Sequence, residues 1–312
     1  SSDLNIAPTF HNLYFYPFGQ KSVVEGRTRR IQEQVNKNGQ LFKPIARDTI
    51  KAFGTIGFAV HVNDLINGSG NICGIVHLTV EVNETKTFEL DQTKISFDDV
   101  RYVQSHSDFE LGRNQKRTVH KCFVEPGNKF SNYRNLQNNG YLKVEQNEIL
   151  TVKVTATDSH KNQSELRFVI KGDSAAKERY SEPMHLQKWM PNKINVFEDS
   201  LLRLSTPFDA LYDTLFFKYS VSANKPKILS KVYKIGNPDY PLHKKIEIRF
   251  KSEVIPPHLS DKLVLVDYSD QELTVLDAKP KVEWNTIHGN IGAFANVAIA
   301  CDTISPTILP LN

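Results

Sequence analysis

Apolar and polar residues alternate with a period of two through most of this chain, and helical periodicity is nearly absent. Phe58, Val60 and Val62 would share one face of a strand, and the residues between them would share the other. Residues 74–82 and 150–157 repeat this pattern. Strands with one apolar and one polar face are typical of antiparallel sheets packed in two layers. The pattern therefore predicts an all-β protein built from antiparallel β-sandwiches of the Ig-like kind.

The length of 312 residues is too great for one such sandwich and suits two. Strand patterns fill residues 1–172, which we assign to a first sandwich. The polar stretch 173–193 contains Pro183 and Pro191, and we interpret it as a linker or a crossing strap. Strand patterns resume in residues 194–301, which we assign to a second sandwich.

A short repeat joins the two ends of the sequence. Residues 6–10 (IAPTF) match residues 304–308 (ISPTI), and an aspartate precedes each segment, Asp3 and Asp302. A proline ahead of an apolar strand fixes how the chain enters a sheet. We therefore expect residues 302–312 to begin a further module, with a chance match over five positions as the alternative.

Composition excludes several classes of protein. Hydrophobic residues make up 39% of the chain, which is enough for cores and excludes disorder over most of its length. No run approaches the roughly 18 consecutive apolar residues of a transmembrane helix, so we predict none. The formal net charge of +4 is mild and scattered, which argues against nucleic acid as a partner.

Three cysteines, Cys73, Cys122 and Cys301, lie in apolar strand-like runs. They form no C-x-x-C pair, so neither a zinc ribbon nor a thioredoxin-like motif is present. Two interpretations remain open: three buried free thiols, or a disulfide between Cys73 and Cys122.

No catalytic constellation can be recognised. The sequence has no H-x-H, no H-E-x-x-H, no G-x-S-x-G, no P-loop and no G-x-G-x-x-G. We therefore name no catalytic residue and no metal ligand, and we expect no cofactor in this segment. A calcium site at Asp98, Asp99 and Asp108 is a minor alternative. His106 and His120 fall in a basic stretch that we interpret as a solvated loop, with contact to an acidic polymer as the alternative.

An interaction surface is suggested by three successive aromatic residues, Tyr14, Phe15 and Tyr16, because at least one of them must leave the core face of its strand. The basic stretch adds further polar candidates. The predicted surface consists of Tyr14, Tyr16, Arg113, Lys116 and Arg117. The alternative is that the displaced ring packs under a neighbouring loop and that the basic residues form a solvated face.

Asp followed by Ser or Thr and then an aliphatic residue occurs five times, and this pattern resembles the O-glycosylation signal of some Gram-negative envelope proteins. The hydroxyl groups concerned belong to Thr49, Ser174, Ser200, Thr214 and Thr303. Any residue that carries a sugar must be exposed. The alternative is that Asp-Thr is simply a common entry into a strand.

Several short motifs, taken in order, resemble the region that follows the catalytic domain in certain Gram-negative LytM/lysostaphin-type zinc endopeptidases (peptidase family twenty-three). They occupy residues 5–17, 54–69, 95–102, 233–243 and 302–308. The resemblance implies peptidoglycan remodelling in the periplasm or cell envelope. In that family two His and one Asp bind zinc, with the signature H-x3-D and H-x-H. Neither pattern occurs here, so no catalytic residue is carried over and zinc is expected only in a domain upstream of Ser1.

The second half also resembles a sandwich type found in netrin receptors and ankyrins, through residues 204–211 and 292–295. Such domains are interaction and spacer modules. We therefore expect a non-catalytic accessory region that positions or regulates a peptidoglycan metalloendopeptidase and contacts peptidoglycan or envelope proteins. The alternatives are a stand-alone envelope module that binds protein or glycan, and a hydrolase with a carboxylate pair on a β scaffold.

Overall fold

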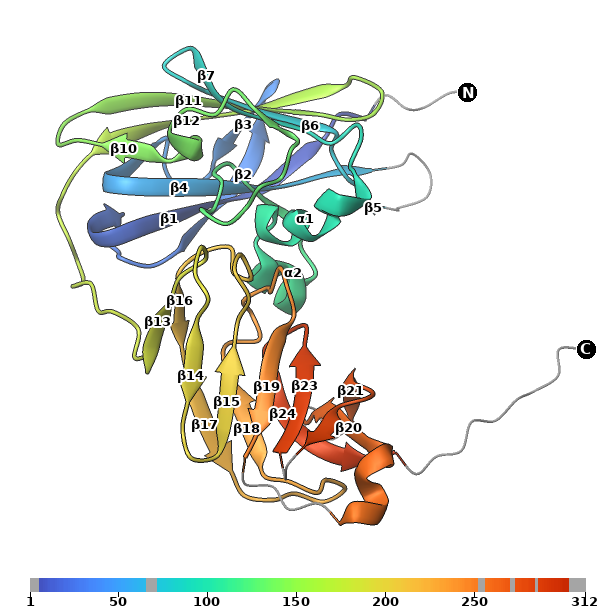
Figure 1. Cartoon of the computed structure of the whole chain (residues 1–312). Coiled ribbons are helices and arrows are strands. Elements are labelled where there is room, and N and C mark those ends of the chain that lie inside the picture. The colour runs from blue at the N-terminus through green and yellow to red at the C-terminus, as the bar shows by residue number, and fades with distance from the viewer. Residues whose placement is uncertain (1–5, 66–71, 252–255, 270–272, 284–285, 303–312) are drawn as a thin grey trace, which may run out of the picture. The chain divides into compact units, whose positions relative to one another are not determined.

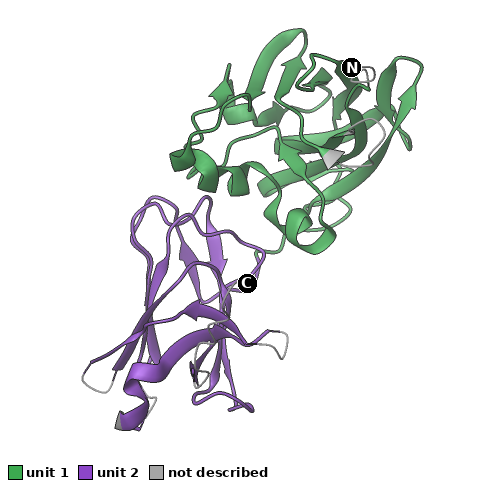
Figure 2. Ribbon diagram, turned by 90° about the vertical axis from the view of Figure 1, so that its right-hand side faces the viewer, with its two compact units in different colours: residues 1–182 green, residues 183–312 purple. Residues whose placement is uncertain are grey.

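The structure is a computed structural model that describes residues 6–65, 72–251, 256–269, 273–283 and 286–302 (Figure 1). The chain divides into two compact units, Ser1–Glu182 and Pro183–Asn312 (Figure 2). Strands account for 49% of the structure and helices for 9%, which confirms the all-β prediction. No helix among the described residues is long and apolar enough to cross a membrane.

The first unit contains most of the long strands. They are β1 (Thr9–Val24), β2 (Ile31–Asn38), β3 (Leu41–Pro44), β4 (Thr49–Leu65), β5 (Ile72–Cys73), β6 (His77–Val82), β7 (Thr85–Asp91), β8 (Val119–Lys121), β9 (Tyr133–Arg134), β10 (Leu142–Val144), β11 (Ile149–Thr157) and β12 (Gln163–Gly172). The helices are α1 (Val100–His106) and α2 (Phe109–Gln115), with the 3-10 turns η1 (Phe97–Asp99) and η2 (Asn138–Gly140).

Five of these strands close into a barrel. β1 pairs with β2 and β4, β2 pairs with β3, and β12 completes the ring through parallel pairing with β3 and β4. Strands β11, β6, β7 and β9 continue from β12 as an antiparallel extension. The first unit is therefore a barrel with an extended sheet rather than the predicted Ig-like sandwich. The physical reason is that β1 and β4, at 16 and 17 residues, are long enough to bend, and their pairing shifts register between Phe18 and Val23.

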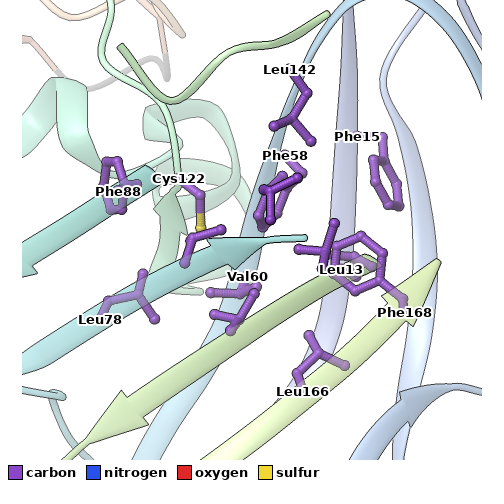
Figure 3. Packing of buried hydrophobic residues seen from close by; sticks show 14 of the residues in the cluster. Leu13, Phe15, Phe58, Val60, Leu78, Phe88, Cys122, Leu142, Leu166 and Phe168 are labelled. Atoms are coloured by element: carbon purple, nitrogen blue, oxygen red, sulfur yellow. The ribbon is translucent and has the colours of Figure 1, made fainter. Parts of the chain in front are cut away.

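The core of this unit confirms the apolar face predicted for β4, whereas Ala59 and His61 on the opposite face are buried as well. Phe58, Val60 and Val62 are buried together with Phe15 and Phe168. Figure 3 shows the rings of Phe15, Phe58 and Phe168 meeting in this core, and the Phe58 and Phe168 centroids lie 5.5 Å apart in an edge-to-face arrangement.

Residues 100–115 differ from the prediction because they form helices α1 and α2. Each helix has only seven residues, which is too short to show a helical period. Leu111 of α2 packs against Tyr14, Ala59 and Val119 on the outer face of β1, β4 and β8. His106 and His120 are consequently buried rather than part of a solvated loop.

The second unit is built from short strands. They are β13 (Gln187–Trp189), β14 (Val196–Glu198), β15 (Leu202–Ser205), β16 (Leu215–Phe217), β17 (Tyr219–Ser222), β18 (Val232–Ile235), β19 (Ile246–Phe250), β20 (Leu263–Asp267), β21 (Thr274–Asp277), β22 (Lys281–Glu283), β23 (Thr286–Ile291) and β24 (Ala295–Cys301), with the 3-10 helix η3 (Pro257–Lys262). Two five-stranded sheets, β14-β15-β19-β23-β22 and β17-β18-β24-β20-β21, share one hydrophobic core. A small third sheet pairs β13 with β16, where Trp189 stacks on Phe217.

The polar stretch 173–193 is divided between the units. Residues 173–182, called the strap below, cross the first unit, where Asp173 N–H donates to the Ala52 carbonyl. Residues 187–189 form β13 of the second unit. The predicted start of a further module at 302–312 lies outside the described residues apart from Asp302.

All three cysteines are free thiols, so the Cys73–Cys122 disulfide is not formed. Cys122 is buried, and its burial raises the pKa of the thiol well above its usual value. Cys73 and Cys301 are only partly buried, which differs from the prediction of three buried thiols.

Candidate functional site

The residues predicted to form an interaction surface lie on and around α2. Tyr14 is only 1% exposed because α2 covers it, and its hydroxyl accepts a hydrogen bond from Arg117 Nη1 at 3.3 Å. Tyr16 is partly buried next to it, whereas Arg113 and Lys116 are exposed. The structure thus brings Tyr14, Tyr16 and Arg117 together, but the Tyr14 ring packs inside the fold, as the alternative interpretation had it.

The Asp108 carboxylate fixes α2 to the barrel. It accepts hydrogen bonds from the Tyr16 hydroxyl at 2.6 Å, from Arg30 Nη1 at 3.1 Å and from Leu111 N–H at 2.9 Å, the last as the N-cap of α2. Arg30 also pairs with Glu110 at 3.0 Å. Burial, followed by the charge of Asp108, raises the pKa of Tyr16 well above 10, so this hydroxyl stays a neutral donor. The network is a structural clamp.

No metal site is formed in the part of the chain that the structure describes: no three His, Cys, Asp or Glu residues are placed to hold an ion. Of the aspartates considered for calcium, Asp99 accepts a hydrogen bond from the Ser131 hydroxyl and Asp108 is engaged in the clamp.

Four histidines from four elements form a cluster: His106 of α1, His120 of β8, His61 of β4 and His11 of β1. His106 Nε2 lies 3.0 Å from His120 Nδ1, and His106 Nδ1 lies 3.1 Å from the Tyr133 hydroxyl. The His61 and His11 rings lie 4.8 Å apart. Desolvation lowers the pKa of His61 and of His120 to about 4 and that of His106 well below 6.5. The buried members of the cluster are therefore neutral near pH 7.

The predicted O-glycosylation residues occupy different environments. Thr49, Ser174 and Ser200 are exposed, and Thr214 is partly buried with its hydroxyl 3.8 Å from Met190 Sδ. Thr303 lies outside the described residues. Exposure therefore permits modification at Thr49, Ser174 and Ser200.

The most exposed large apolar side chain of the described residues is Phe97, at 97%. It lies on η1 between Ile95 and Val100, which are 39% and 51% exposed, and next to the exposed Asp98. Sequence reasoning treated this stretch as a motif but did not predict it as a surface. The signal that could have revealed it was an aromatic residue set among polar ones in a stretch without any periodicity. We call residues 95–100 the displayed turn.

Hydrogen bonds hold the displayed turn in place. The Ser96 hydroxyl accepts from Asp98 N–H at 3.3 Å, and the Ser96 carbonyl accepts from Asp99 N–H at 3.0 Å. From the neighbouring loop, the Ser131 hydroxyl donates to Asp99 and the Asn132 side chain donates to the Lys94 carbonyl at 2.6 Å. The backbone is therefore fixed while the Phe97 ring stays in solvent.

Comparison with known protein families gives one match. A family model described as a Zu5-like domain matches residues 186–302, which lie within the second unit. The same residues carry the likeness to the sandwich of netrin receptors and ankyrins described above. No curated protein matches the chain. The likeness of the chain to the endopeptidase region remains a prediction.

Proposed function

We propose that this chain is a non-catalytic interaction region of the bacterial cell envelope, accessory to a LytM-type peptidoglycan metalloendopeptidase that it positions or regulates. Its partners would be envelope proteins or peptidoglycan in the periplasm. The motifs at 5–17, 54–69, 95–102 and 233–243, taken in their order along the sequence, support the link to the peptidase. Zinc would belong to a separate catalytic domain. An Ig-like sandwich in the second unit alone is the finer part of this proposal.

The observation that carries the proposal is the displayed turn. Burying a phenylalanine side chain contributes about 1.5–3 kcal/mol, which this fold leaves unused at Phe97. Aromatic side chains are enriched among the residues that dominate binding energy in protein interfaces. A fixed backbone also avoids the entropic cost of ordering a loop upon binding. The turn therefore suits insertion of Phe97 into an apolar pocket of an envelope protein.

Photo-crosslinking tests this. Benzoylphenylalanine at position 97 should yield one defined adduct with an envelope protein in the cells that make this protein. The same residue at Lys37, an exposed position on β2, is the matched control and should yield none. Phe97→Ser should abolish binding of the partner identified in this way. Adducts of equal yield at both positions would contradict the proposal.

A second candidate function is a stand-alone module that binds envelope protein or glycan, and the mixed polar and aromatic lining of a hollow in the first unit favours it. The intact mass of the naturally produced protein distinguishes the accessory region from the stand-alone module. A mass well above that of 312 residues supports the accessory region, and a mass close to it supports the stand-alone module. A second measurement of the intact mass, made after enzymatic removal of glycans, tests whether Thr49, Ser174 and Ser200 carry sugars.

A further inference from the structure

A hollow of about 670 Å³ lies in the first unit, where the strap crosses the barrel. One wall consists of β1 and β4, which contribute Lys21 and Phe53, and the other consists of the strap, which contributes Arg179 and Tyr180. A volume of this size lies within the range of roughly 300–1,000 Å³ that small-molecule sites occupy.

Two backbone hydrogen bonds fix the strap wall to the barrel unit. Asp173 N–H donates to the Ala52 carbonyl at 2.9 Å, and Lys177 N–H donates to the Gly26 carbonyl at 2.7 Å. Gly26 has φ +75°, and a β-carbon there would lie only 3.0 Å from Lys177 N. Glycine at this position lets the strap approach, so the hollow is part of the fold.

One acidic side chain of the hollow is already engaged. Glu178 Oε1 accepts hydrogen bonds from Thr28 N–H at 2.9 Å and from the Thr28 hydroxyl at 3.3 Å. The same oxygen lies 3.8 Å from Arg29 Nε. The bond from Thr28 N–H is the largest cause that lowers the pKa of Glu178, so this carboxylate stays charged and bound to its partners. Its ion-pair partner is Arg29, and no ion pair joins it to Lys21 or Arg179.

Those cations are Lys21 and Arg179, which are exposed at the hollow. Within the described residues neither has an ion-pair partner. A second carboxylate, Glu182, lines the hollow and has an interaction of its own. Two cations that no ion pair engages favour an anion, and a guanidinium is suited to a carboxylate. Phe53 and Tyr180 are partly buried and offer apolar ring surface beside these charges.

The hollow also offers hydrogen-bonding groups to a ligand that carries hydroxyl groups. The amide of Gln20 and the hydroxyl of Ser174 line the same hollow, and each can both donate and accept a hydrogen bond. Aromatic surface, an amide, a hydroxyl and two cations together match a ring compound that has an apolar face, several hydroxyl groups and a carboxylate.

We propose that this hollow binds an acidic saccharide, with the sugar ring against Phe53 and Tyr180 and its carboxylate held by Lys21 and Arg179. This site is separate from the displayed turn. The proposal rests on the second candidate function, a glycan-binding module, and its failure would leave the crosslinking test at Phe97 unaffected. The acidic sugar could come from a uronic acid polymer or from the lactyl-bearing sugar of peptidoglycan after removal of its stem peptide, which frees the lactyl carboxylate. The experiment distinguishes these sources.

Titration calorimetry on the full chain tests the proposal with two matched pairs of ligands. Trigalacturonate is compared with neutral galactotriose, and the N-acetylglucosamine–N-acetylmuramic acid disaccharide with chitobiose. At least one acidic member should bind ten or more times more tightly than its neutral counterpart, and the pair that does so identifies the source. Equal affinity within both pairs, or no binding of either acidic ligand, would overturn the proposal.

Variants locate the site. Lys21→Gln with Arg179→Gln should weaken binding of the acidic ligand at least tenfold, and Tyr180→Leu should weaken it as well. Glu182→Gln removes a carboxylate that lines the hollow and should strengthen binding. Lys171→Gln, an exposed lysine of β12 outside the hollow, is the control and should leave binding unchanged. Undiminished affinity in the Lys21/Arg179 double variant, with a native circular dichroism spectrum, would refute the assignment.

Discussion

At the scale of single residues, burial decides what the polar side chains of this protein do. Tyr16 and Arg30 would each be candidates for a surface by their chemistry, yet both are bound to the Asp108 carboxylate under the edge of α2. A buried polar group must find a partner, because leaving it unpaired costs about 1–3 kcal/mol. In contrast, Phe97 is apolar and exposed, which makes it the better indicator of an interaction.

The histidine cluster predicts how stability responds to acid. His61 and His120 have pKa values of about 4 in the folded chain, whereas an unperturbed histidine has a pKa of 6.5. The unfolded chain therefore binds more protons between pH 6.5 and 4, so stability is complete above pH 6.5 and falls as the pH drops toward 4. For His120 alone the loss reaches about 3 kcal/mol below pH 4.

Urea unfolding at about pH 7.5, 5.5 and 4.5 measures this loss. Both tryptophans, Trp189 and Trp284, belong to residues 183–312, so their fluorescence reports on the second unit, which holds none of these four histidines. Tyrosine absorbance and circular dichroism should shift to lower urea as the pH falls, more than tryptophan fluorescence does. A tryptophan transition that shifts as strongly as the others would contradict the assignment to the cluster.

At the scale of elements, closure of the barrel depends on the parallel pairing of β12 with β4, where Gly172 lies opposite Ala52. A β-carbon on Gly172 would lie 1.7 Å from the Glu145 carbonyl oxygen, which is a backbone atom that cannot move away cheaply. Gly172→Ala should therefore destabilise the first unit by about 3 kcal/mol. The end of the sheet and the start of the strap would both shift.

Gly74→Ala is the matched control, because a β-carbon there meets no atom within 4 Å. Its effect should stay within about 0.5 kcal/mol. Denaturant midpoints of the two variants and the natural chain give the comparison. A Gly172→Ala protein as stable as the Gly74→Ala protein would show that the barrel closes differently from this structure.

At the scale of the whole molecule, each unit has a hydrophobic core of its own, one around Phe58 and Phe168 and the other around Trp189 and Phe250. Residues 1–182 and 183–312 should therefore fold when produced separately. Amide spectra of both pieces should show the dispersed signals of folded β proteins. A collapsed spectrum for either piece would mean that its core is incomplete without the other unit.

The sequence predicted some elements well because their signal is local. Alternation at Phe58, Val60 and Val62 places these three residues on one face of β4, and that face lies in the main core. The same holds for Ile246, Ile248 and Phe250 in the second unit. The other face of β4 is also buried at Ala59 and His61, which the alternation did not predict. Periodicity could not reveal α1 and α2, because the seven residues of each helix span fewer than two full turns.

The sequence by itself determined that this protein is all-β and which apolar strand residues face the cores. It also determined which residue types are available to bind a ligand. Only the tertiary structure decided that β12 meets β4 in parallel to close a barrel, that Tyr14 lies under α2, and that Lys21 and Arg179 share one hollow. The physical reason is the separation along the sequence of the residues concerned. Alternation between faces is a property of neighbouring residues, whereas these three arrangements join residues more than 90 positions apart, and no local pattern encodes such contacts.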